Sequence, residues 1–282
     1  MLLGIHVSTG GKIYEALERA HELGCNTMQI FSRNPQRWRS DFLAGQDVAE
    51  FKRRQAKFKI RPVFVHIPYL INLASPNPRL YQASIDAYIE DMLEAQLMGA
   101  EYIVTHMGSH KDTSEQDGLK RFTEAMNTII ARTAQTKVRI LLGNTAGSGS
   151  WLGYNFAHQK QIIDGLDKKE KVGLCLDTAH AYLAGYDLAV PQGLEALLAQ
   201  IEETVGLSLL KLIHLNDAKG ALGSHHDRHE HIGKGSIGLE GMRAIINHPK
   251  LKNIPFILET PKKEEGDELM DLNTVRKLRR GA

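Results

Sequence analysis

The chain has 282 residues, of which 42% are hydrophobic and 24% charged, and its formal net charge at pH 7 is +2. This length permits a large core in one domain, and the small charge excludes a polybasic coat, although a local basic rim could still face an anionic partner. Cys25 and Cys175 lie too far apart to indicate a disulfide framework, which fits a reducing compartment. We expect a cytoplasmic protein, because the sequence predicts neither a signal peptide nor a membrane span.

Short apolar runs rich in β-branched residues alternate with longer segments at helical period, which is typical of βα units around a parallel sheet. The predicted strands are Leu2–Val7, Thr27–Phe31, Pro62–Ile67, Tyr102–Met107, Arg139–Asn144, Val172–Asp177, Leu209–Asn216 and Pro255–Glu259. The predicted helices are Lys12–Leu23, Arg79–Met98, Gly118–Ala134, Gln159–Gly165, Leu194–Glu203, Leu239–Asn247 and Asn273–Arg280. Eight strands favour a single (β/α)₈ TIM barrel over residues 1–282. A six-stranded doubly wound fold is the alternative, but the first βα turn lacks G-x-G-x-x-G.

In a (β/α)₈ barrel the active site lies at the carboxyl ends of the strands, and six predicted strands of this chain carry histidine, aspartate or glutamate there. The residues at or just after these ends are His6, His66, His106, Asp177, His180, His214, Asp217, Asp227, His229 and Glu259. Burying so many polar groups without partners would be very costly. Imidazole and carboxylate groups together are ligands of zinc and related divalent metals, so we expect a multinuclear metal site at this rim.

The motifs around these residues resemble endonuclease IV, a family of zinc-dependent apurinic/apyrimidinic (AP) endonucleases of base-excision repair. They are GIHVS (4–8), HIPYLINLASP (66–76), THMGSH (105–110), NTAGSGSWLG (144–153), CLDTAHAYLAGYDL (175–188), HLNDAKG (214–220), DRHEHIGKGSIG (227–238) and ILETP (257–261). The resemblance implies a (β/α)₈ barrel that holds three zinc ions. The implied ligands are His66 and His106 for the first zinc, Asp177, His214 and Glu259 for the second, and His180, Asp227 and His229 for the third. Glu259 is also the implied catalytic residue, which orients or deprotonates the attacking water.

The resemblance further implies a monomer that acts on double-stranded DNA. It would cleave on the 5′ side of an abasic site, leaving a 3′-hydroxyl and a 5′-deoxyribose phosphate, and would also remove blocked 3′ ends as a 3′-diesterase. An enzyme cannot read a missing base and must sense the gap, so Tyr69 and Leu70 are expected to enter the duplex. Three arginines and a tryptophan in the loop 32–39 suit phosphate contacts. The inserting arginine of the family aligns with Gln36, beside Arg37, which leaves the second wedge open between these two residues.

One position departs from the family pattern. At the end of the fifth strand the family has E-N-T-A-G, whose glutamate bridges the first two zincs, whereas this chain has Gly143 followed by an intact N-T-A-G. Either the glycine is tolerated and water or another acid replaces the bridge, or the site is impaired by a natural or engineered change. We favour impairment, because the strand gains nothing obvious from a glycine. Even changes behind metal ligands cost about 10–100-fold in metal affinity or activity, so we expect fewer zincs and a slower reaction.

Two alternative functions remain. The chain could bind abasic DNA without cleaving it, or it could be a metal-dependent sugar isomerase or epimerase, since such enzymes share the barrel and a similar rim. The isomerase is disfavoured because it needs only one or two metals and has no use for Tyr69 and Leu70. The sequence does not identify the native metal, the range of damaged bases, or the roles of His225, His226 and His231.

Overall fold

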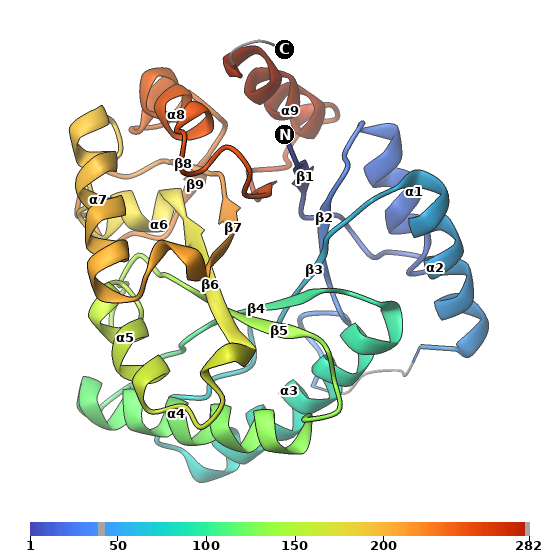
Figure 1. Ribbon diagram of the computed structural model, residues 1–282, viewed down its shortest axis with the longest axis vertical. Coiled ribbons are helices and arrows are strands. Elements are labelled where there is room, and N and C mark those ends of the chain that lie inside the picture. The colour runs from blue at the N-terminus through green and yellow to red at the C-terminus, as the bar shows by residue number, and fades with distance from the viewer. Residues whose placement is uncertain (39–42, 280–282) are drawn as a thin grey trace.

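Eight parallel strands form the central sheet of the molecule, with helices around its outside (Figure 1). A computed structural model of the chain describes residues 1–38 and 43–279. The strands run in the order β1–β10–β7–β6–β5–β4–β3–β2. Their bounds are β1 (Leu3–Ile5), β2 (Met28–Phe31), β3 (Val63–His66), β4 (Tyr102–His106), β5 (Arg139–Gly143), β6 (Val172–Asp177), β7 (Leu210–His214) and β10 (Phe256–Leu258). The end strands meet at a parallel bridge between His6 and Gln29, where the Val7 amide donates to the Gln29 carbonyl oxygen at 2.7 Å. The predicted TIM barrel is confirmed.

The helices follow the strands as a (β/α)₈ barrel requires. They are α1 (Glu15–Glu22), α2 (Gly45–Phe58), α3 (Pro78–Met98), α4 (Glu115–Arg132), α5 (Phe156–Asp164), α6 (Thr178–Leu183), α7 (Pro191–Thr204), α8 (Gly238–Asn247) and α9 (Asp267–Leu278). The sequence did not predict α2, because only Val48, Phe51 and Gln55 of this charged helix are buried. The last helix begins earlier than predicted, and Arg280, its predicted end, lies outside the described residues. None of the described helices has the length and hydropathy needed to cross a bilayer.

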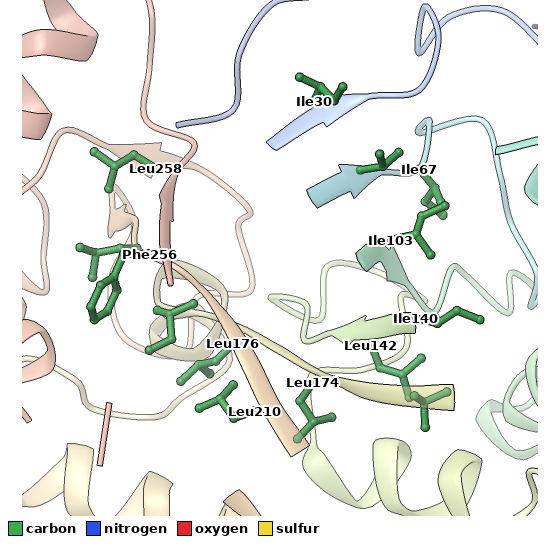
Figure 2. Close-up of a cluster of buried hydrophobic side chains, with 14 of the residues drawn as sticks. Ile30, Ile67, Ile103, Ile140, Leu142, Leu174, Leu176, Leu210, Phe256 and Leu258 are labelled. Atoms are coloured by element: carbon green, nitrogen blue, oxygen red, sulfur yellow. The ribbon is translucent and has the colours of Figure 1, made fainter. Parts of the chain in front are cut away.

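Side chains alternate along each strand between the outer and the inner face of the barrel. In Figure 2 the labelled side chains, such as Ile103, Leu142 and Leu174, point outward from the ring of strands, where the helices cover them. The side chains between them fill the barrel interior, and this inner cluster consists of Phe64, Val104, Leu141, Cys175, Leu212 and Ile257. Because side chains alternate with a period of two, the residues two positions further on also face inward, one layer nearer the carboxyl ends. These six inward positions are His66, His106, Gly143, Asp177, His214 and Glu259.

The loop after β7 is built around one buried carboxylate, that of Asp217. This residue lies in β8 (Asp217–Ala218), which pairs antiparallel with β9 (His229–Glu230). Its two oxygens accept hydrogen bonds from the backbone amides of Ala218, Gly233, Gly235, Ile237 and Gly238, at 2.8–3.4 Å. Asp217 follows the end of a strand but serves the loop that carries His229, and it belongs to neither group of candidate metal ligands.

We therefore predict that Asp217→Asn destabilises the protein by about 2–3 kcal/mol, because hydrogen bonds to a charged group are worth roughly 1.5–3 kcal/mol and the amide removes the charge and one acceptor. Urea unfolding of the metal-free protein measures this free energy. Asp112→Asn, in an exposed loop, is the matched control and should leave the midpoint unchanged. Equal midpoints for the two variants would contradict a structural role for Asp217.

Candidate metal centre

The carboxyl ends of the strands surround a cavity of about 480 Å³. Its lining includes six of the eight predicted metal ligands, namely His66, His106, His180, Asp227, His229 and Glu259. The other two, Asp177 and His214, are fully buried and contact this set. The fold thus gathers all eight predicted ligands at one end of the barrel.

Within this set, two groups of side chains offer ligand atoms that all lie within 4.8 Å of one another. The first consists of Asp177, His214 and Glu259, with His214 Nδ1 at 3.1 Å from Glu259 Oε2 and 3.8 Å from Asp177 Oδ2. The second consists of Asp177, His180 and His229. Asp227 adjoins the second group, since its Oδ1 lies 3.0 Å from His180 Nε2 and 3.7 Å from His229 Nε2. Asp177 therefore belongs to both groups, whereas the resemblance implied that it binds the second zinc alone.

Most of the histidines are oriented by a hydrogen bond from one ring nitrogen. An oxygen acceptor beside a ring nitrogen requires N–H there, which leaves the other nitrogen as the ligand atom. The acceptors are the backbone oxygens of Ile67 for His66 Nδ1 (2.7 Å), Asn144 for His180 Nδ1 (2.9 Å) and Glu259 for His229 Nδ1 (3.0 Å), and the side-chain oxygen of Gln29 for His214 Nε2 (2.8 Å). This arrangement is typical of histidines that bind metals.

His106 differs from these histidines, and its neighbour in the sheet is Gly143. The His106 ring lies between His66 and His180, with centroids 5.3 Å and 5.4 Å away, and its Nδ1 is buried without a hydrogen-bond partner among the described residues. A Cβ atom on Gly143 would lie 3.1 Å from Nδ1 and Cε1 of this ring. A side chain at position 143 therefore requires the ring to shift by a few tenths of an ångström, and no hydrogen bond from Nδ1 opposes that shift.

The electrostatics divide the site into two halves. Burial lowers the pKa of His66 to about 4 and that of His106 to about 3. Burial also favours a lower pKa at His180, but the carboxylates of Asp177 and Asp227 outweigh burial and raise the pKa of His180 to about 9. At Glu259 burial is outweighed by His214, which holds the pKa of the carboxyl well below its usual value. Gly143 supplies no charge to the His66 and His106 half.

Of the predicted DNA-contacting residues, Tyr69 lines the cavity, Leu70 follows it in the loop after β3, and the other two lie in the loop after β2. Tyr69 is 71% exposed and lines the cavity, with its ring 5.4 Å from that of Phe31, whereas Leu70 is half-buried. Gln36 and Arg37 are both exposed in the loop that follows β2. The structure thus presents Tyr69 more openly than Leu70.

One expectation for this loop is wrong. Arg33, one of the three arginines expected to suit phosphate contact, is only 7% exposed, and its Nη2 lies 3.0 Å from Asp91 Oδ2 on α3. Ser32 Oγ donates to the other oxygen of Asp91 at 2.5 Å. Arg33 and Ser32 therefore anchor the start of the loop to the barrel. Arg39, the third arginine, lies outside the described residues.

Two of the three histidines without assigned roles have structural partners. His225 Nδ1 donates to the Ala146 carbonyl oxygen at 2.7 Å, and His231 Nδ1 lies 2.9 Å from Asp271 Oδ2 on α9. His226 lines an open groove beside the cavity, together with Lys219 and Arg228.

Gln29, which was not among the predicted site residues, is fully buried and contacts three polar side chains of the site. The sequence does contain a signal for it: Gln29 is a polar amide within an otherwise apolar strand, and alternation places its side chain on the inner face of the barrel. His6, a strand-end residue given no role, is one of these three side chains, with Nδ1 at 3.4 Å from Glu259 Oε1.

Comparison with known proteins agrees with this geometry. Residues 17–278 match the family described as xylose isomerase-like TIM barrel. A probable endonuclease 4 of Halothermothrix orenii is 42% identical over 280 residues, covering 99% of this chain and 100% of the relative. The crystal structure of endonuclease IV from Thermus thermophilus superposes with a TM-score of 0.89 at 31% identity and covers 100% of both chains.

A D-tagatose 3-epimerase-like protein superposes with a TM-score of 0.76 but is only 18% identical, covering 99% of this chain and 97% of the other. This second likeness concerns the fold alone. Identity over the full length separates the two relationships, and this chain belongs to the endonuclease IV family.

Proposed function

We propose that this chain is a zinc-dependent AP endonuclease whose activity is reduced by Gly143. The observation that carries the proposal is the convergence of all eight predicted ligands on one cavity, in a chain that belongs to the endonuclease IV family. Its substrate would be double-stranded DNA with an abasic site, cut on the 5′ side, or DNA with a blocked 3′ end. We propose that it acts as a single-domain monomer.

The donor set fits divalent zinc. Imidazole nitrogens and carboxylate oxygens are its usual ligands, and the hydrogen bonds described above leave one nitrogen of each oriented histidine free for a metal. We assign His66 and His106 to one zinc, Asp177, His214 and Glu259 to a second, and His180, Asp227 and His229 to a third. Bound zinc would lower the pKa of water and offset charge on the phosphate and the leaving oxygen.

The chain's own residues supply the remaining chemistry. Glu259 lies at the cavity with its Oε2 3.1 Å from His214 Nδ1, and its carboxylate can accept a hydrogen bond or a proton from the attacking water. Tyr69, exposed at the cavity, can enter the gap that a missing base leaves in the stack, with Leu70 beside it. Arg37 or Gln36 would contact the duplex from the loop after β2.

The reduced activity is expected because the first zinc would have few ligands and no negatively charged one. Two neutral imidazoles alone would hold the first zinc, and Gly143 contributes neither a ligand atom nor a negative charge to that half of the site. A non-cleaving protein that binds abasic DNA is the limiting case of this proposal. A sugar epimerase is not favoured, because the likeness to that group concerns the fold alone.

The first prediction from this function concerns activity. Gly143→Glu should increase the rate at which an abasic-site duplex is nicked by about 10–100-fold or more, because it restores a carboxylate beside His106. Single-turnover cleavage of a labelled oligonucleotide measures this rate. Gly45→Glu is the matched control, since a Cβ at this remote position on α2 meets no atom within 4 Å. Equal nicking by the parent and Gly143→Glu would contradict the impairment, and no nicking by either would contradict the enzyme assignment.

The second prediction concerns metal content. Elemental analysis after dialysis should find one or two zincs per parent chain and a higher content in Gly143→Glu, because the first zinc has the weakest ligand set. Removal of zinc with a chelator should abolish nicking by both proteins, and added zinc should restore it. Three tightly held zincs in the parent would show that the glycine is tolerated.

The third prediction concerns lesion recognition. Tyr69→Ala should weaken binding to an abasic duplex by about 1–3 kcal/mol, the usual value of an aromatic contact with a base, and should affect an intact duplex less. Fluorescence anisotropy with both duplexes measures the difference. Leu97→Ala removes a side chain that is 49% exposed on α3 and should change neither affinity. An equal loss for both duplexes would rule out a lesion-specific role for Tyr69.

A further inference from the structure

Gln29 is a polar side chain at an inward position of the barrel, level with the apolar Phe64 on β3. It lies on β2, forms an isolated parallel bridge to His6, the residue that follows β1, and has no exposed surface. A buried amide requires hydrogen-bond partners. All the side-chain partners of Gln29 belong to the rim of the barrel, and two of them, His214 and Glu259, are candidate ligands of the same metal.

The amide contacts the two ligands through different atoms. Gln29 Oε1 accepts a hydrogen bond from His214 Nε2 at 2.8 Å, and Gln29 Nε2 donates to Glu259 Oε1 at 2.5 Å. The same Nε2 lies 2.9 Å from His6 Nδ1. The reverse orientation of the amide would place its oxygen against the Glu259 carboxylate, and two oxygens that only accept cannot share a hydrogen bond. The partners therefore determine the positions of Oε1 and Nε2.

These contacts determine which ligand atoms remain for a metal. With its proton fixed on Nε2, His214 directs Nδ1 toward Glu259 Oε2 at 3.1 Å and Asp177 Oδ2 at 3.8 Å. With Oε1 held by the amide, Glu259 directs Oε2 to the same place. One side chain thus orients two ligands from different strands, β7 and the end of β10.

We propose that Gln29 is a positioning residue for the metal site formed by Asp177, His214 and Glu259, which fixes the His214 ring and the Glu259 carboxylate before a metal binds. The inference rests on the proposed function, because it assigns a metal to these residues. Partners that orient metal ligands typically change metal affinity or activity by about 10–100-fold when they are lost.

The test uses Gln29→Met, which keeps the length of the side chain but removes both hydrogen bonds. We expect the zinc held by Asp177, His214 and Glu259 to bind about 10–100-fold more weakly than in the parent, which competition with a chromophoric chelator, without DNA, detects as one weakened binding step. Gln55→Met is the matched control, because Gln55 is also buried, at 4% exposure, but lies on α2 away from the site. Thermal unfolding of the metal-free proteins separates this effect from a loss of stability, which alone would lower the melting temperature and leave zinc affinity unchanged.

Long-range ¹H–¹⁵N spectra of the zinc-loaded parent test the same proposal even if Gln29→Met does not fold. The His214 ring proton should reside on Nε2 and exchange slowly with water, and in Gln29→Met it should exchange faster. A ring proton on Nδ1 in the parent, or equal zinc affinity in the parent and Gln29→Met, would overturn the positioning role alone. Failure of the parent to bind zinc would overturn the metal site itself and this inference with it.

Discussion

Side chains on a β-strand alternate between its two faces, and in a closed parallel sheet this alternation decides which residues meet. Five of the six inner apolar side chains of this barrel are followed two residues later by a candidate ligand, as Cys175 is followed by Asp177 and Leu212 by His214, and the sixth, Leu141, is followed by Gly143. A shift of one residue in any strand would turn its ligand outward against the helices. The position of the candidate metal centre therefore depends on the same register that packs the core.

The barrel positions the strand-end residues, whereas hydrogen bonds behind them orient their rings and carboxylates. Backbone oxygens of Ile67, Asn144 and Glu259 hold three histidines, and Gln29 holds a fourth. Asp217 stabilises the loop that brings His229 to the cavity. Gly143 differs from the other inward strand-end residues, because it adds neither a ligand nor a charge. Burial lowers the pKa values of His66 and His106, whereas neighbouring carboxylates raise the pKa of His180 despite its burial.

Much of this arrangement could be predicted from the sequence, because it depends on local periodicity. Apolar runs at regular spacing predicted all eight barrel strands, and the residues that end them predicted which side chains gather at one end of the barrel. Helix α2 could not be predicted in the same way, since its buried stripe is thin and its remaining residues are charged. Arg33 and Asp217 carried the residue types of a functional site, but tertiary partners decided otherwise: Asp91 on α3 for the first, and backbone amides of a distant loop for the second. The role of Gln29 likewise depends on contacts between strands far apart in sequence.

We propose that this ring of strand-end residues binds zinc and that Gly143 leaves one part of it weak. Diffraction from zinc-soaked crystals on both sides of the zinc absorption edge tests this claim most directly. We expect strong anomalous peaks among Asp177, His214 and Glu259 and among His180, Asp227 and His229, with a weak peak or none between His66 and His106. A full peak between His66 and His106, or no peak anywhere in the ring, would contradict the account.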